Sequence, residues 1–93
     1  MAKLMTAEEA TQAKQTLKDG IKRGELTVGQ ATQRMRKITG KSQKDYAQTI
    51  VGISPRVLAE IERDVANPTI ATLNKIGRPF GYVVSFVHKG SNK

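Results

Sequence analysis

The sequence contains no cysteine, a single histidine and no long apolar run. The absence of cysteine excludes disulfides and thiolate metal sites. The histidine, His88, has no carboxylate pair near it, and the chain has no glycine-rich phosphate loop and no cluster of metal-ligand residues. These absences argue against an enzyme, and we expect neither a cofactor nor a metal. Because no stretch suits a signal peptide or a bilayer span, we expect a cytoplasmic protein without a membrane partner.

Acidic residues are also scarce: 8 Asp and Glu stand against 16 Lys and Arg, which gives a net charge of +8 over 93 residues. The excess is local, since residues 34–56 carry six basic side chains against Asp45 alone, whereas residues 1–33 carry five against four. Concentrated positive charge fits the neutralisation of nucleic-acid phosphates and the release of their counterions. The alternative is a solvated basic surface that aids solubility.

Residues 42–63 are the most informative stretch, because they are typical of two short helices joined by a glycine turn. Ser42 and Ser54 are N-cap residues, Pro55 suits the first position of the second helix, and Gly52 between the helices can adopt a left-handed conformation. The second helix has one apolar and one polar face. The apolar face carries Val57, Leu58 and Ile61, and the polar face carries Arg56, Ala59, Glu60 and Arg63.

An apolar face that anchors a helix and a polar face offered to a groove are the layout of a DNA-reading helix-turn-helix. Over roughly residues 30–80 the chain resembles the lambda-repressor/Cro (XRE) family of regulators. The residues that carry the resemblance are Gln43, Ala47, Gly52-Ile53-Ser54, Leu58, Ile61-Glu62 and Asn67-Pro68-Thr69. The resemblance implies an all-α helix-turn-helix domain of about five helices that binds the major groove of double-stranded DNA.

The chain departs from the family pattern at two places. From Ala47 to Leu58 it is one residue longer than the usual family spacing, with the extra residue near Ile50-Val51. The first motif helix must therefore run one residue longer, or the turn must bulge. Asp64 stands where the family usually has glycine, and aspartate tolerates a left-handed conformation better than most residues.

Outside the motif, capping and turn residues predict the remaining helices. A capping box at Thr6 begins a helix that ends at Gly20 or Gly24, a second helix runs from about residue 28 to 38, and Asn67 caps a helix after the motif. We divide the chain into four parts. They are an N-terminal helical extension at 1–26, the helix-turn-helix domain at 27–81, a C-terminal dimerisation strand at 82–88 and a flexible tail at 89–93.

The segment at 82–88 is β-branched and aromatic, which predicts a strand. A lone strand leaves backbone groups unpaired, so pairing with the same strand of a second copy would complete it. The alternatives are an extended tail docked on its own domain and pairing with the N-terminal residues. A homodimer would place two recognition helices one DNA turn apart, roughly 34 Å, on a palindromic operator. The expected dimerisation residues are Tyr82, Val83, Val84, Ser85, Phe86 and Val87.

Base reading is expected at the second motif helix. Arg56 can bond both O6 and N7 of a guanine, a contact worth about 1–3 kcal/mol of discrimination. The alternative for Arg56 is an intrahelical pair with Glu60, which could itself accept a bond from a cytosine amino group. Pro55 either rests on a thymine methyl group or only rigidifies the start of the helix. Ala59 lies on the same polar face.

The candidate phosphate contacts are Gln43, Ser54, Lys41, Lys44 and Arg63. Gln43 resembles the family glutamine that bonds a phosphate and braces the recognition helix, and helix N-termini favour anions. The alternative for Lys41, Lys44 and Arg63 is that they are solvated surface residues without a DNA contact. By resemblance, Arg36 and Glu62 form a structural ion pair between the first core helix and the recognition helix.

The helix-turn-helix with a short strand after it is most similar to HipB-type antitoxins, which repress their own operon and bind a kinase-like toxin. The resemblance therefore implies an autoregulating repressor with a HipA-like toxin as partner. Two other hypotheses stay open: a stand-alone XRE-type regulator without a toxin, and a protein-interaction adaptor that has lost DNA binding. The adaptor predicts weak, salt-insensitive DNA association, and the basic run at 34–56 argues against it.

Overall fold

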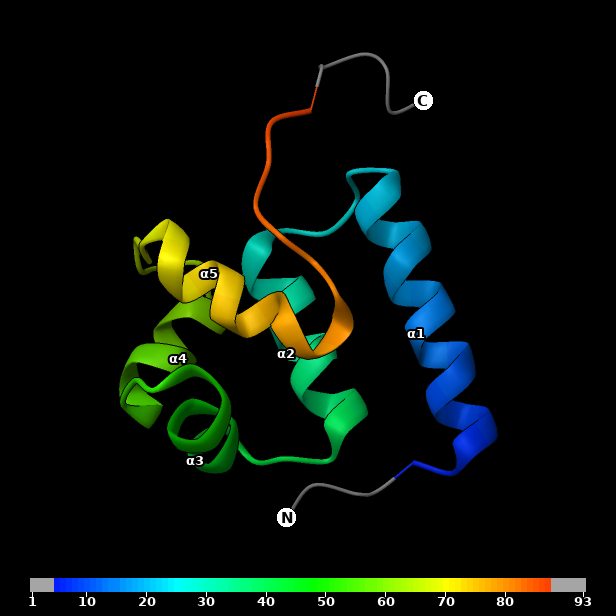
Figure 1. The fold of residues 1–93 in the computed structure, drawn as a ribbon, viewed down its shortest axis with the longest axis horizontal. Helices are drawn as coiled ribbons and strands as arrows, with labels where there is room; N and C mark the ends of the chain where they lie inside the picture. The colour runs from blue at the N-terminus through cyan, green and yellow to red at the C-terminus, as the bar shows by residue number, and fades with distance from the viewer. Residues whose placement is uncertain (1–4, 88–93) are drawn as a thin grey trace.

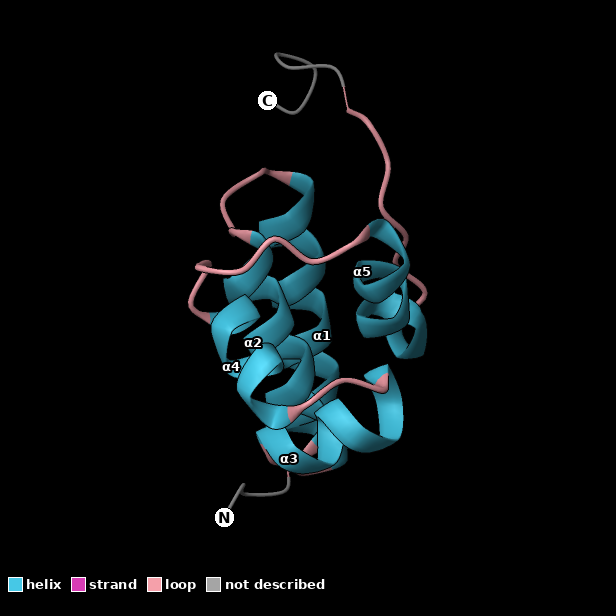
Figure 2. Cartoon of the chain, turned by 90° about the vertical axis from the view of Figure 1, so that its left-hand side faces the viewer, coloured by secondary structure: helices cyan, strands magenta, loops and turns pink. Residues whose placement is uncertain are grey.

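The computed structural model describes residues 5–87, and this part of the chain is helical and contains no strand (Figures 1 and 2). The expected all-α helix-turn-helix architecture is confirmed, and the described residues hold five α-helices, of which α1 is the additional N-terminal helix. In chain order the elements are α1 (Ala7–Lys22), α2 (Val28–Thr39), α3 (Gln43–Asp45), the π-helix η1 (Tyr46–Val51), α4 (Pro55–Glu62), α5 (Ile70–Gly77) and the 3-10 helix η2 (Arg78–Phe80). Within residues 5–87, no helix has the length and apolar character needed to cross a membrane.

The helix starts share one chemistry: a hydroxyl oxygen accepts a hydrogen bond from the backbone N–H three residues further on. These N-caps are Thr6, Thr27, Ser42, Ser54 and Thr69. The cap of α5 corrects the expectation of Asn67. Thr69 Oγ1 accepts from the Thr72 N–H at 3.1 Å and also donates to Thr72 Oγ1 at 3.0 Å, so the helix begins at Ile70.

The core lies where α1, α2, η1, α4 and α5 meet. Its buried apolar residues are Leu17, Met35, Tyr46, Ala47, Val51, Leu58, Ile61 and Ile76. The N-terminal helix α1 packs on α2 of the same chain and contributes Leu17, which is 1% exposed. Tyr46 lies at the centre and donates its hydroxyl hydrogen to the carbonyl oxygen of Ile76 at 2.8 Å. Burial, with a smaller contribution from the charge of Glu62, raises the pKa of Tyr46 to about 12.

The longer spacing between Ala47 and Leu58 is taken up by the π-helix η1. A π-turn closes its hydrogen bonds over five residues instead of four, so it holds one more residue than an α-turn. The Gly52 N–H donates to the carbonyl oxygen of Ala47, five residues back, at 2.7 Å. Gly52, with φ of 80°, then ends the helix. The helix therefore widens before the turn, and Ala47, Val51 and Leu58 all stay buried.

The C-terminal end of α4 packs closely against the N-terminal end of α2. Asp64 follows α4 with φ of 60°, and its carboxylate accepts from the Gly29 N–H at 2.8 Å and from Thr27 Oγ1 at 2.6 Å. A carboxylate at this position also interacts favourably with the dipole of α2. Gly29 permits the contact, because a Cβ there would lie 2.5 Å from the carbonyl oxygen of Glu62 and 2.6 Å from that of Ile61.

The strand expected at 82–88 is not formed: residues 82–87 are extended coil, and His88 lies outside the described residues, as does the expected flexible tail at 89–93. The Tyr82 N–H donates to the carbonyl oxygen of Gly77 at 3.0 Å, and the Val84 N–H donates to Asn74 Oδ1 at 2.8 Å. Because these N–H groups find acceptors at α5, the segment docks as an extended tail on its own domain.

The Tyr46 hydroxyl predicts a pH-dependent stability. Its pKa rises from 10.0 to about 12 on folding, so its contribution is complete below pH 10.0 and is lost as the pH rises toward 12. Tyr46→Phe leaves the buried carbonyl oxygen of Ile76 without its donor and should lower the free energy of unfolding by about 1–3 kcal/mol at neutral pH. Urea unfolding across this pH range should show a smaller alkaline loss for Tyr46→Phe than for the wild type. Equal losses in the two proteins would contradict the assignment.

Gly29→Ala should destabilise the fold, because the added Cβ overlaps two backbone carbonyl oxygens of α4 that cannot move independently. We expect a loss of about 1–3 kcal/mol in the free energy of unfolding, despite the better helix propensity of alanine. Gln33→Ala is the matched control, since Gln33 is exposed on the same helix and its substitution should change stability by less than about 0.5 kcal/mol. Equal stabilities of the two variants would disprove the close helix contact.

Candidate nucleic-acid interface

The first turn of α4 is presented to solvent. Ser54 Oγ accepts from the Val57 N–H at 3.1 Å, and the half-buried Pro55 occupies the first helical position. The side chain of Arg56 is 87% exposed, and its Nε lies 3.6 Å from Glu60 Oε2. An exposed pair of this spacing contributes about 0.3–0.5 kcal/mol, so Arg56 can leave it for a stronger partner at little cost.

Val57 shares this exposed surface, although the sequence pattern placed it on the buried face with Leu58 and Ile61. Val57 is 39% exposed, whereas Leu58 and Ile61 are 0% and 1% exposed. In a helix of eight residues the core covers a narrow stripe, and Val57 precedes Leu58 by one position, which is about 100° around the helix. An apolar side chain next to Arg56 is suited to a thymine methyl group. The sequence held one indication that Val57 is exposed, namely its position directly next to the buried Leu58.

The other candidates on α4 lie further along the helix. Ala59 and Glu60 are half-buried, and the side chain of Glu60 is 37% exposed. Arg63 is exposed but lies just beyond the last residue of the helix, where its N–H donates to the carbonyl oxygen of Ala59. At 1.5 Å per residue, Arg63 and Arg56 are separated by roughly 10 Å along the axis. The structure therefore does not bring all the candidate side chains of α4 together.

A buried carboxylate holds α2, α3 and α4 in place. Glu62 Oε2 lies 2.7 Å from Arg36 Nε, and Oε1 accepts from Arg36 Nη2 at 3.1 Å and from Gln43 Nε2 at 3.0 Å. The side chains of Arg36 and Glu62 are 12% and 3% exposed. Arg36 Nη1 also donates to the carbonyl oxygen of Lys41 at 3.2 Å. We call these contacts the Glu62 clamp; its bidentate geometry is the strong form of an ion pair.

The start of α3 has the features of an anion-binding helix end. Ser42 caps the helix, the side chain of Lys44 is exposed, and Lys41 is half-buried just before it. Backbone N–H groups at a helix start carry partial positive charge, and the lysines add to it. The Glu62 clamp uses one amide hydrogen of Gln43, and an amide nitrogen carries two.

Taken together, the short helices on either side of Gly52 and the exposed arginine at the start of the second define a helix-turn-helix DNA-binding domain. A family model described as helix-turn-helix matches residues 33–83, which is 51 of the 93 residues. The chain belongs to this helix-turn-helix family, of the lambda-repressor/Cro (XRE) type, and is a DNA-binding transcriptional regulator. No curated protein and no solved structure matches the chain significantly. Helix α1 lies outside the matched region.

Breaking the Glu62 clamp on one side should be costly. Arg36→Met leaves the carboxylate of Glu62 buried without its cation, and we expect a loss of about 3–5 kcal/mol in the free energy of unfolding. The double variant Arg36→Met/Glu62→Leu removes both charges and should recover most of this loss. Urea unfolding measures all the variants.

Arg56→Met is the matched control for this experiment, because it breaks the exposed pair with Glu60 and should cost less than about 0.5 kcal/mol. If Arg36→Met is no more destabilising than Arg56→Met, the clamp does not hold the helices together.

Proposed function

We propose that the chain is a sequence-specific repressor that acts in the cytoplasm, binding a palindromic operator as a homodimer with α4 in the major groove. Family membership supports binding to double-stranded DNA. The observation that carries the finer proposal is the first turn of α4, where the side chain of Arg56 is 87% exposed on a helix whose other end is held by the Glu62 clamp. A fixed helix with an exposed, weakly paired arginine at its start suits base reading.

Arg56 is the proposed reader of a guanine, and Val57 the proposed contact to a neighbouring thymine methyl group. Glu60 is 3.6 Å from Arg56 and is placed to orient the guanidinium or to accept from a cytosine amino group. Pro55 fixes the start of the helix, and Ala59 is small enough to let the helix approach the base edges. In these roles the exposed Arg56 and Val57 of the first turn contact the bases, Glu60 supports Arg56 or contacts a cytosine, and the half-buried Pro55 and Ala59 only shape the helix.

The proposed phosphate contacts flank this reading surface. Lys44 and the capped start of α3 approach the DNA backbone on one side, with Lys41 and the second amide hydrogen of Gln43 nearby. Ser54 and Arg63 take the same role at the two ends of α4. Each phosphate neutralised adds roughly 0.9 to the slope of log affinity against log salt.

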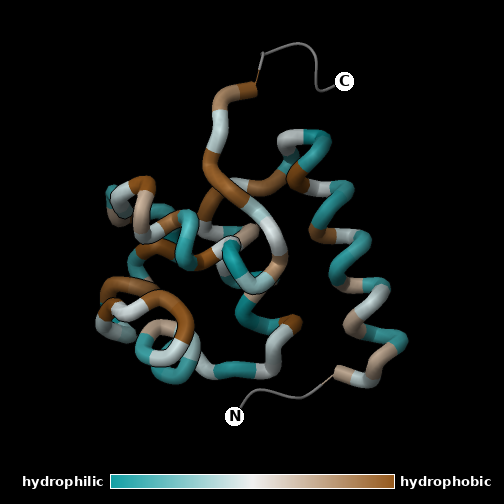
Figure 3. Tube along the Cα trace, in the orientation of Figure 1, coloured by the Kyte–Doolittle hydropathy of each residue, from teal (hydrophilic) through white to brown (hydrophobic). Residues whose placement is uncertain are grey.

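The homodimer is supported by apolar side chains that the monomer leaves in water. Val83, Val84, Phe86 and Val87 are 76%, 44%, 102% and 71% exposed, and the brown C-terminal segment in Figure 3 shows this concentration. Such a run marks an interaction surface more often than a free one. In an extended chain successive N–H groups alternate between its two sides. No hydrogen bond of the described residues uses the N–H of Val83 or Ser85, so we expect these two donors to suit a second copy.

The antitoxin role and the HipA-like toxin partner stay predictions. The likeness to HipB-type antitoxins rests on a helix-turn-helix followed by a C-terminal strand, and residues 82–87 form no strand in this chain. A stand-alone regulator accounts for the same site. The exposed Arg56 and Lys44 favour either regulator over an adaptor without DNA binding.

Selection of bound duplexes from a random pool tests the proposal. The wild type should enrich a palindromic motif, and Arg56→Ala should lose preference at one guanine per half-site by about 5- to 150-fold. Arg78→Ala removes the same charge from an exposed residue after α5 and should keep the motif. Failure of the wild type to enrich any motif would overturn the proposal. If Arg56→Ala only weakens all duplexes equally, Arg56 contacts phosphate and not a base.

A further inference from the structure

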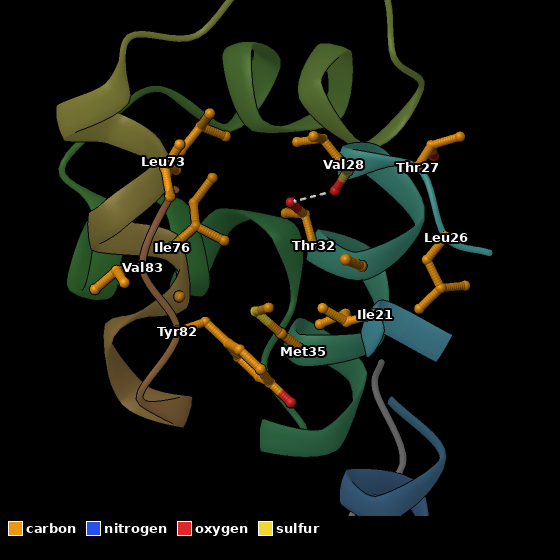
Figure 4. A pocket seen from close by; sticks show the side chains of 13 residues that line it. Ile21, Leu26, Thr27, Val28, Thr32, Met35, Leu73, Ile76, Tyr82 and Val83 are labelled. Carbon is orange, nitrogen blue, oxygen red and sulfur yellow. Dashed lines mark hydrogen bonds between the residues drawn. The ribbon is translucent and has the colours of Figure 1, made fainter. Parts of the chain in front are cut away.

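A groove with no charged lining residue lies beside the C-terminal segment (Figure 4). It has a volume of about 220 Å³ and opens between the start of α2, helix α5 and residues 82–84. Its apolar walls include Leu26, Val28, Ala31, Leu73 and Val83. Charged residues make up 26% of the chain, so a groove lined without a charged side chain is a candidate binding surface.

Phe86 is an aromatic side chain that packs on none of residues 5–87. It is 102% exposed, whereas Tyr46 is fully buried and Phe80 and Tyr82 are half-buried against the core. A packed aromatic side chain buries about 150–250 Å² of surface, so a free one forgoes a large hydrophobic contribution. Phe86 stands only two residues beyond Val84, which lines the groove.

We propose that Phe86 of each copy in the homodimer occupies this groove on the other copy. The inference rests on the homodimer of the proposed function and names the contact that forms it. An apolar cavity of about 150 Å³ accepts a benzene molecule, so the groove, at about 220 Å³, has room for a phenyl ring. Reciprocal insertion is the isologous arrangement that a two-fold axis requires.

The groove is closed to the Phe86 of its own chain by the path of the segment. Val83 and Val84 form part of the groove wall, and the Val84 N–H is bonded to Asn74 Oδ1 at 2.8 Å. An extended chain advances about 3.3 Å per residue, so Phe86 lies beyond the wall. To enter its own groove the chain would have to reverse direction within Ser85.

The electrostatics permit a second copy at this groove, although they do not by themselves favour one. Two chains of net charge +8 repel each other, and an uncharged groove lets them approach without bringing like charges into contact. The lining offers no cationic side chain to DNA phosphates. In Figures 1 and 2 the C-terminal segment lies at the end of the molecule away from α3, so a dimer formed there leaves the start of α3 free.

Sedimentation equilibrium without DNA tests the contact through two variants. Phe86→Ala removes the inserted ring, and Val28→Lys places a charge at the groove, where Val28 is 51% exposed and its replacement spares the core. Each should weaken the wild-type dimer about 10-fold or more, with an unchanged circular dichroism spectrum. Val65→Ala is the matched control, since Val65 is 63% exposed but does not line the groove, and should dimerise as the wild type does.

An equimolar mixture of Phe86→Ala and Val28→Lys separates exchange between copies from docking within one. The mixed dimer keeps one Phe86 and one intact groove on opposite chains, so it should form more tightly than either variant with itself. A mixture no tighter than its components would overturn the exchange, as would a monomeric wild type or a Phe86→Ala dimer of wild-type affinity. Because no DNA is present, these results are independent of whether the chain selects an operator.

Discussion

The carboxylate of Glu62 is 3% exposed where α2, α3 and α4 meet, and it accepts hydrogen bonds from Arg36 and Gln43. A buried charge is tolerated only while its partners surround it, so these helices cannot shift independently without exposing or stranding it. Asp64 adds a second tie, since it binds the start of α2 just past the end of α4. One end of α4 is thereby fixed, and the other carries Arg56 into solvent. The backbone of a helix held in this way needs no ordering when it meets DNA, so the conformational entropy still to be lost there is mainly that of the exposed Arg56 side chain.

The chain separates its charged and apolar functions in space. The excess of basic side chains lies at residues 34–56, whereas the longest run of exposed apolar residues lies in the C-terminal segment beside the groove. This division suits a DNA-binding regulator whose basic surface meets an anionic polymer and whose apolar surface stays free for the second copy that we propose. The π-helix η1 matters to the first surface, because it absorbs an additional residue inside the helix and leaves the glycine turn at Gly52 regular.

Local chemistry made much of the fold predictable. The hydroxyl caps at Thr6, Ser42 and Ser54 and the left-handed turn at Gly52 follow from neighbouring residues alone. The rest depends on contacts that are distant in sequence. β-Propensity predicted a strand at 82–88, but a strand also needs a partner, and in one chain the segment bonds to α5. The exposure of Val57 depends on how narrow a stripe of α4 the core covers. Which side chains touch DNA depends on how the protein is oriented on the duplex, and this orientation is set by contacts with the DNA.

Amide chemical shifts, followed by nuclear magnetic resonance while a selected duplex is added, test the central claim most directly. The account predicts that the largest changes fall at Ser54–Val57 and at Ser42–Lys44, with the Nε–H of Arg56 moving among the side chains. The amides of Leu73 and Val83, beside the groove, should keep the chemical shifts that they have in the DNA-free protein. Large changes around the groove, with Arg56 unmoved, would show that this chain meets DNA with a different surface and would contradict the account.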